Sequence, residues 1–244
     1  MRAGATAEGP LLSVNDLSAG YGAVPVLKHV SLAVHPAELV ALVGSNGAGK
    51  TTLLRVLSGL LRGSAGQVRF KGQELGQLKP DQIFGLGLVQ VPEGRQLFAR
   101  MSVNDNLLMG AYRRHDRPAI RRGLDHVYAL FPQLAERRRQ LAGSMSGGEQ
   151  QMCAMARALM AAPVLMMIDE MSLGLAPVIV QQLMDILAQI RKTGVTVLLV
   201  EQDVQVALSG ADRAYVMETG EVVLSGAARD LMDDPAVRRA YLGT

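Results

Sequence analysis

One stretch of the sequence combines glycines, a lysine and a threonine at a spacing that suits phosphate binding. Residues 44–51 follow the pattern G-x-x-x-x-G-K-[ST], between a predicted strand, Glu38–Val43, and a predicted helix, Thr51–Leu61. Glycines let the backbone curl so that successive N–H groups face a phosphate, and the start of the helix adds a partial positive charge. The alternative is an ordinary glycine-rich turn, which the strand and helix context makes the weaker interpretation.

The residues of this loop have separate expected roles. Lys50 would place a positive charge at the β- and γ-phosphates of a nucleotide, and the hydroxyl group of Thr51 would be a ligand for Mg²⁺. The expected nucleotide-binding residues are Gly44, Ser45, Asn46, Gly47, Ala48, Gly49, Lys50, Thr51 and Thr52.

A pair of acidic residues follows a second apolar run. Val164–Ile168 has the length of a buried strand, and Asp169 and Glu170 come directly after it, at the edge where α/β sheets place their ligands. We expect Asp169 to hold Mg²⁺ and Glu170 to orient and deprotonate the water that attacks the terminal phosphate. Such a run alone is weak evidence, but together with the glycine-rich loop it predicts nucleotide hydrolysis.

A third motif, Met145–Gln151, contains the sequence Ser-Gly-Gly and lies at the start of another predicted helix, Glu149–Met160. A helix N-terminus is a second place where an anion can bind, and one chain has no evident use for two γ-phosphate sites. Two chains packed head to tail would use both, because each motif would close over the partner's nucleotide. The other interpretation is a helix that Ser146 simply caps. The expected nucleotide-binding residues of this motif are Ser146, Gly147, Gly148 and Glu149.

The predicted elements place all three motifs in one α/β domain. Strands and helices alternate on both sides of a helical block that contains no convincing strand. Two early strands, Leu12–Leu17 and Val26–Val34, have the mixed alternation of antiparallel strands, and Thr219-Gly220 is expected to join a last hairpin. We expect a flexible tail over residues 1–10 and one domain over residues 11–244, with a helical subdomain inserted at about 94–160.

Composition excludes several classes of protein. Of the 244 residues, 49% are hydrophobic and 19% are charged, which rules out a disordered chain. No run approaches the ~20 apolar residues of a transmembrane helix. The net charge is only +3, so we expect no nucleic-acid partner and interpret the arginine-rich stretches 113–122 and 137–139 as solvated helix faces. The single cysteine, Cys153, is expected to pack in the core.

These motifs, in this order, resemble the ATPase subunits of ABC transporters over residues 11–243. Within that family the sequence is most similar to the second ATPase subunit of branched-chain amino acid importers. The resemblance rests on the phosphate loop and on Val91–Phe98, Ser144–Met152, Ser172–Pro177, Val200–Asp203 and Arg239–Gly243. It implies a P-loop (RecA-like) ABC ATPase core with an antiparallel β subdomain and an inserted α-helical subdomain. It also implies ATP and Mg²⁺ as cofactors.

The resemblance assigns further residues by position. Tyr21 resembles the aromatic residue that stacks on adenine, and a tyrosine in a glycine-bounded turn is the rival interpretation. Glu93 stands where most of the family has a glutamine beside Mg²⁺ and the attacking water, and it could bind the metal directly. Gln202 stands where most members have a histidine. Ala176 stands where most members have an aspartate. Gln202 can donate a hydrogen bond but cannot take up a proton near neutral pH, which leaves Glu170 as the base.

By resemblance, the chain is expected to hydrolyse ATP and to energise solute import from the cytoplasmic, inner face of the cell membrane. Its expected partners are a second, related ATPase subunit, two transmembrane permease subunits and, indirectly, an extracytoplasmic solute-binding protein. A permease would dock on the helical block. The alternatives are an ATPase subunit of a urea or amide importer, a non-transport ABC ATPase and a nucleotide sensor, and the presence of both Asp169 and Glu170 argues against a sensor.

Overall fold

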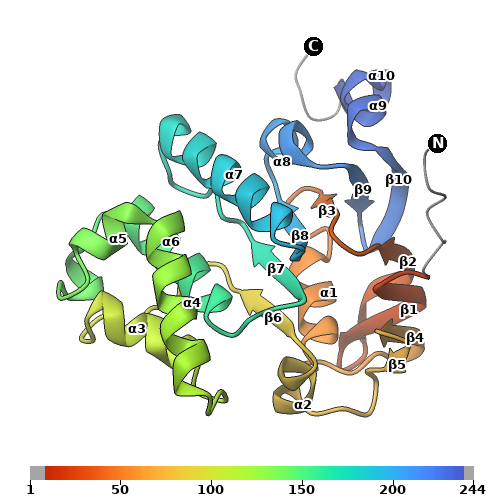
Figure 1. The fold of residues 1–244 in the computed structure, drawn as a ribbon. Helices are drawn as coiled ribbons and strands as arrows, with labels where there is room; N and C mark the ends of the chain where they lie inside the picture. Colours follow the sequence, from red (N-terminus) through yellow and green to blue (C-terminus); the bar gives the residue numbers. More distant parts are fainter. Residues whose placement is uncertain (1–8, 239–244) are drawn as a thin grey trace, which may run out of the picture.

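The computed structural model describes residues 9–238, and the expectations for most of the N-terminal tail and for Arg239–Gly243 lie outside the described residues. A six-stranded sheet runs through the middle of the molecule, between a four-stranded sheet and a group of helices (Figure 1). This arrangement confirms the predicted α/β class with an antiparallel part. We call the group of helices the helical lobe; it contains α3 (Val103–Gly110), α4 (Arg117–Leu130), α5 (Pro132–Glu136) and α6 (Gly147–Leu159).

The central sheet has the strand order β10-β9-β3-β8-β7-β6. The five strands from β9 to β6 in this order run parallel to one another, and β10 is antiparallel to β9. Thr219 and Gly220, with φ of 48° and 88°, join β9 to β10, as a tight hairpin requires and as the sequence predicted. The strands are β3 (Leu39–Val43), β6 (Leu88–Val91), β7 (Leu165–Asp169), β8 (Thr196–Glu201), β9 (Arg213–Glu218) and β10 (Glu221–Ala227).

The smaller sheet is antiparallel throughout, with the strand order β2-β1-β4-β5. Its strands are β1 (Leu12–Tyr21), β2 (Val24–Val34), β4 (Ala65–Phe70) and β5 (Gln73–Glu74). Tyr21 is the last residue of β1 and pairs with Val24, directly before the turn, whereas the predicted strand ended at Leu17. The hairpin extends the strand further than the sequence pattern indicated, since the backbone pairing continues to Tyr21 and Val24.

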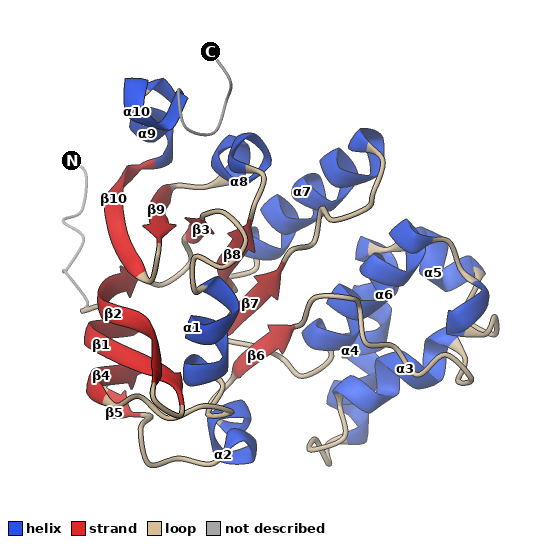
Figure 2. Ribbon diagram, turned by 180° about the vertical axis from the view of Figure 1, so that it is seen from behind, coloured by secondary structure: helices blue, strands red, loops and turns tan. Residues whose placement is uncertain are grey.

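Both faces of the central sheet are covered by apolar side chains. On β3, Val40 and Leu42 pack towards the small sheet, whereas Ala41 and Val43 pack against α8. Helix α1 lies between the two sheets, and α7 covers the opposite face (Figure 2). The helices outside the lobe are α1 (Lys50–Leu57), α2 (Pro80–Gly85), α7 (Pro177–Lys192), α8 (Val204–Gly210), α9 (Ala228–Asp233) and α10 (Pro235–Val237). The sequence did not predict α2, α5, α9 and α10, because such short helices show little apolar periodicity.

The helical lobe has its own packing, in which α3 and α6 lie side by side. Gly110 makes this contact close, because a Cβ atom there would lie 1.9 Å from the carbonyl oxygen of Arg157. Cys153 is fully buried among the apolar side chains of α6, and burial raises the pKa of its thiol to about 11, which confirms the expected packing role. Across residues 9–238, no helix is both long and apolar enough to span a lipid bilayer.

Candidate nucleotide-binding site

The loop between β3 and α1 forms a backbone cradle. Gly47 and Gly49 have φ of 83° and 106°, a region that side chains disfavour. At Gly44 a Cβ atom would lie 2.3 Å from the carbonyl oxygen of Met217, so the loop fits beside β9 only with a glycine. Helix α1 begins at Lys50 without an acidic residue in its first turn or a side-chain cap. The partial positive charge of its N-terminus is therefore available to an anion.

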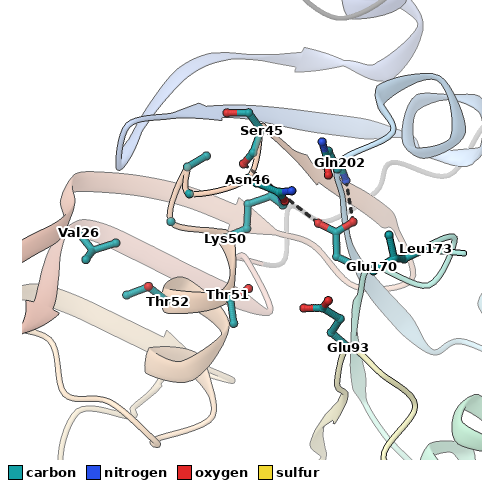
Figure 3. A pocket seen from close by; sticks show the side chains of 13 residues that line it. Val26, Ser45, Asn46, Lys50, Thr51, Thr52, Glu93, Glu170, Leu173 and Gln202 are labelled. Atoms are coloured by element: carbon teal, nitrogen blue, oxygen red, sulfur yellow. Dashed lines mark hydrogen bonds and ion pairs between the residues drawn. The ribbon is translucent and has the colours of Figure 1, made fainter.

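This loop forms one wall of a cavity of about 390 Å³ (Figure 3). The other wall comes from distant parts of the sequence, with Glu93 after β6, Glu170 after β7 and Gln202 after β8. The three residues meet because parallel strands that lie side by side end at the same edge of the sheet. The described residues that line the cavity are Val26, Ser45, Asn46, Gly47, Ala48, Gly49, Lys50, Thr51, Thr52, Glu93, Glu170, Leu173 and Gln202.

Lys50 and Glu170 form an ion pair at the centre of this cavity (Figure 3). The Nζ atom of Lys50 lies 3.1 Å from Oε1 of Glu170 and donates a hydrogen bond of 2.7 Å to the carbonyl oxygen of Gly44. The other oxygen of Glu170 accepts a hydrogen bond of 3.1 Å from the backbone N–H of Gln202. The Gln202 contact to Glu170 is thus made by the backbone, whereas the sequence had directed attention to its side chain.

Asp169 is the last residue of β7, and its side chain is buried beside the cavity. Its Oδ1 atom has no hydrogen-bond partner among the described residues. Burial, together with the charges of Glu170 and Glu93, raises the pKa of this carboxyl group to about 6, although Lys50 acts in the opposite direction. A buried, unpaired oxygen that faces other carboxylates is the environment that a divalent cation would neutralise.

The remaining residues fit Mg²⁺ that is held together with a nucleotide. Thr51 and Glu93 line the same cavity as the phosphate loop. Among residues 9–238 no group of three or more His, Cys, Asp or Glu side chains is arranged to hold a metal by itself. Mg²⁺ often takes only one or two carboxylates from the protein and further oxygen ligands from phosphates and water. The unpaired Oδ1 atom of Asp169 and the hydroxyl group of Thr51 suit a site in which the protein and the nucleotide both supply ligands to Mg²⁺.

Tyr21 lies outside the lining of the cavity. The residue is 42% exposed, and its hydroxyl group accepts a hydrogen bond of 2.7 Å from Nη1 of Arg55. A hydrogen bond with Thr52 is the main cause that lowers the pKa of this phenol, and Arg55 lowers it too. Thr52 lines the cavity, so the tyrosine stands next to the phosphate loop with an exposed face, as a residue that stacks on a base would.

The motif at the start of α6 has the structure of a capping box. Oγ of Ser146 accepts from the backbone N–H of Glu149, and the Glu149 carboxylate accepts from the N–H of Ser146. Glu149 also pairs with Arg137 at 2.7 Å. Among the described residues that line the cavity, none comes from this motif, which belongs to the helical lobe on the other side of β6 and β7 from α1 (Figures 1 and 2).

One buried carboxyl group near the site was not singled out by sequence reasoning. Glu201, at the end of β8, is fully buried and accepts hydrogen bonds from both the backbone N–H and the hydroxyl group of Ser172. Desolvation raises the pKa of Glu201 to about 7, although the hydrogen bonds from Ser172 act in the opposite direction. The available signal was a glutamate directly after the apolar run 195–200, in a strand that is buried on both faces.

A phosphate cradle at a helix N-terminus, with Asp169 and Glu170 at the end of β7 in the same sheet, defines a P-loop nucleotide-binding protein. A family model described as "ABC transporter" matches residues 27–172. The chain belongs to this ABC transporter family.

Relatives and solved structures agree over nearly the whole chain. The high-affinity branched-chain amino acid transport ATP-binding protein BraG of Pseudomonas aeruginosa is 47% identical, covering 96% of this chain and all of the relative. The probable branched-chain amino acid transport ATP-binding protein LivF of Archaeoglobus fulgidus is 34% identical, with 96% and 99% covered. The ADP conformation of an ATP-binding cassette of an ABC transporter superposes with a TM-score of 0.86 at 24% identity, covering 97% of this chain and 100% of that one, which shows the same fold.

Proposed function

We propose that this chain binds and hydrolyses ATP as the ATP-binding subunit of an importer for branched-chain amino acids. The observation that carries the proposal is the convergence of the phosphate loop, Glu170 and Gln202 on one cavity, with Asp169 beside it. The substrate class comes from the similarity to BraG and LivF, whose names give branched-chain amino acid transport.

The phosphate loop would bind the nucleotide in two ways. Its backbone N–H groups and the N-terminus of α1 face the phosphates, and Lys50 supplies a positive charge. Phosphates that enter the cavity would compete with Glu170 for Lys50, because the ion pair at 3.1 Å occupies the same ammonium group. Nucleotide binding would therefore release one oxygen of Glu170 while the backbone N–H of Gln202 still holds the other.

Glu170 would then act as the general base for hydrolysis. A water molecule between Glu170 and the γ-phosphate forms a bond to phosphorus, its proton passes to the carboxylate, and the bond to the oxygen of ADP breaks. Asp169, Thr51 and Glu93 would hold Mg²⁺, which supplies positive charge to the phosphate oxygens.

The capping motif of α6 would complete the site of a second subunit. Its residues do not line this chain's own cavity, so a nucleotide that contacts both a phosphate loop and this motif requires two chains. The proposed partner is a second, related ATPase subunit in head-to-tail orientation. Ser146, Gly147 and Gly148 would then approach the γ-phosphate bound by that partner, and Tyr21 would stack on adenine in this chain.

A permease would dock on the groove beside the helical lobe. A second cavity of about 310 Å³ lies between the core and α3 and α6, and apolar and aromatic side chains line much of it. Phe98 and Tyr112 are 47% and 61% exposed there, which suits burial against a partner. In this proposal the chain lies at the cytoplasmic face of the membrane with two permease subunits and, indirectly, a solute-binding protein outside. The residues that line this second cavity include Phe84, Phe98, Met109, Tyr112 and Arg157.

Uptake in a strain that lacks the gene tests the proposal. Labelled leucine uptake should disappear with the gene and return with the wild-type chain, but not with Glu170→Gln at equal expression. Labelled urea, measured in parallel, tests the alternative importer. If leucine uptake is intact without the gene, the proposed substrate class is wrong. If the purified transporter does not hydrolyse ATP, the proposed ATPase role is wrong.

A further inference from the structure

The buried carboxyl group of Glu201 lies outside the chemistry described so far. It is fully buried at the end of β8, and a carboxyl group in that environment costs stability unless its oxygens accept hydrogen bonds. Both oxygens accept from the same residue: Oε1 lies 3.0 Å from the backbone nitrogen of Ser172, and Oε2 lies 2.7 Å from its hydroxyl oxygen. Ser172 follows the general base by two positions.

Three consecutive residues at the end of β8 hold the turn that contains Glu170. The carbonyl oxygen of Val200 accepts a hydrogen bond of 2.9 Å from the N–H of Glu170. Glu201 binds Ser172, and the N–H of Gln202 donates to the carboxylate of Glu170 at 3.1 Å. The side chain of Glu201 is thus the middle contact of a row that joins β8 to the chain after β7.

The turn needs such support because Glu170 has an unusual backbone conformation. Its φ is 49°, in the left-handed region that residues other than glycine seldom adopt. A conformation of this kind persists only where the surroundings fix it, and it occurs often at functional sites. Met171, between Glu170 and Ser172, is buried and anchors the middle of the turn by packing.

We propose that Glu201 is a positioning residue for ATP hydrolysis, whose buried carboxyl group fixes Ser172 and thereby holds Glu170 aimed into the nucleotide cavity. The inference rests on the proposed ATPase function. Glu201 does not line the cavity, so it acts through Ser172 and not on the nucleotide. Its loss would affect the hydrolysis step more than nucleotide binding, because the backbone of the phosphate loop lies against β9 and its ion pair with Glu170 is a contact that the phosphates would replace.

The experiment compares variants of the assembled, purified transporter. Glu201→Ala removes both acceptors, and Glu201→Gln keeps the shape, with one oxygen for the Ser172 N–H and an amide that donates to its hydroxyl. We expect Glu201→Ala to lower kcat about tenfold or more with KM and ATP affinity within about twofold of wild type. Glu201→Gln should retain at least about a third of kcat. Ser172→Ala, which loses only the hydroxyl contact, should fall between them.

A matched control separates positioning from loss of stability. Thr196 lies in the same strand, is equally buried and accepts one hydrogen bond, of 2.9 Å from the N–H of Ala37, at the end of β8 away from the site. Thr196→Val should lower the melting temperature but not kcat. If it lowers kcat as much as Glu201→Ala at equal folded fraction, the effect is general destabilisation and the proposal is wrong.

The remaining outcomes are also decisive. An unchanged kcat in Glu201→Ala, with active wild type, overturns the positioning role but leaves the ATPase function intact. Inactive wild-type transporter would instead refute the proposed function itself. If Glu201→Ala cannot be purified folded, Ser172→Ala decides: a fall in kcat at unchanged KM supports the proposal, and an unchanged kcat overturns it.

Discussion

The buried carboxyl group of Glu201 makes stability depend on pH in a way that one substitution isolates. Desolvation raises its pKa from 4.5 to about 7, with smaller upward contributions from Glu170 and Asp203. Between these two values the folded chain binds more protons than the unfolded chain, so stability falls as pH rises. The stabilising contribution is complete below about pH 4.5 and is lost above about pH 7.

The magnitude follows from the two pKa values. A difference from 4.5 to about 7, at about 1.4 kcal/mol for each pH unit, corresponds to about 3 kcal/mol. Glu201→Gln keeps the buried shape but cannot ionise. Its free energy of unfolding should therefore increase relative to that of wild type by about 3 kcal/mol between about pH 4.5 and about pH 8, because only the wild type loses stability. Asp169, with a raised pKa of its own, is present in both proteins and cancels in the comparison.

Urea unfolding followed by far-ultraviolet circular dichroism, at a series of pH values, measures this difference; the chain has no tryptophan for fluorescence. Thr196→Val is the matched control, because its cost in stability should not vary with pH. A difference between Glu201→Gln and wild type that stays constant within about 0.5 kcal/mol would refute the reasoning, since a carboxyl group desolvated only in the folded state must produce a slope. A free energy of unfolding of Glu201→Gln that decreases relative to wild type as pH rises would have the opposite sign and would also refute the reasoning.

Four further predictions concern the site and the lobe. Lys50→Ala should weaken ATP binding by about 2 kcal/mol, roughly thirtyfold, because the phosphates lose a cation; calorimetry measures it, and unchanged affinity would contradict the assigned role. Gln202→Ala should lower steady-state hydrolysis less than Glu170→Gln, because its backbone N–H to Glu170 remains; a larger loss for Gln202→Ala would show that its side chain matters more. Glu170→Gln should form a dimer with ATP and Mg²⁺ in size-exclusion chromatography, alone or mixed with the related subunit. Ser146→Arg in the same chain should prevent that dimer while the monomer still binds ATP, and a loss of monomer binding would place the motif at this chain's own nucleotide. Gly110→Ala should destabilise the fold by about 1–3 kcal/mol, since its Cβ would lie 1.9 Å from the carbonyl oxygen of Arg157, whereas Gly76→Ala, with its nearest atom at 3.7 Å, should be tolerated.

The sequence by itself determined the local parts of the site. The phosphate loop, the acidic pair after β7 and the Ser146 motif were all found from residue type and spacing, because each is a short segment whose chemistry depends on its own backbone. The hairpin at Thr219-Gly220 was predicted for the same reason. The helical block and, within it, helix α6 were predicted, whereas the short helices α2, α5, α9 and α10, which depend on packing, were not.

Only the tertiary structure decided how these segments meet. The strand order puts β8 between β3 and β7, which brings Glu170 against Lys50 and the backbone of Gln202, although 32 positions separate Gln202 from Glu170. The same order buries Glu201 against Ser172 and leaves the Ser146 motif outside the cavity. No local pattern carries this information, because strand order is set by crossover connections and by burial of both faces of the sheet.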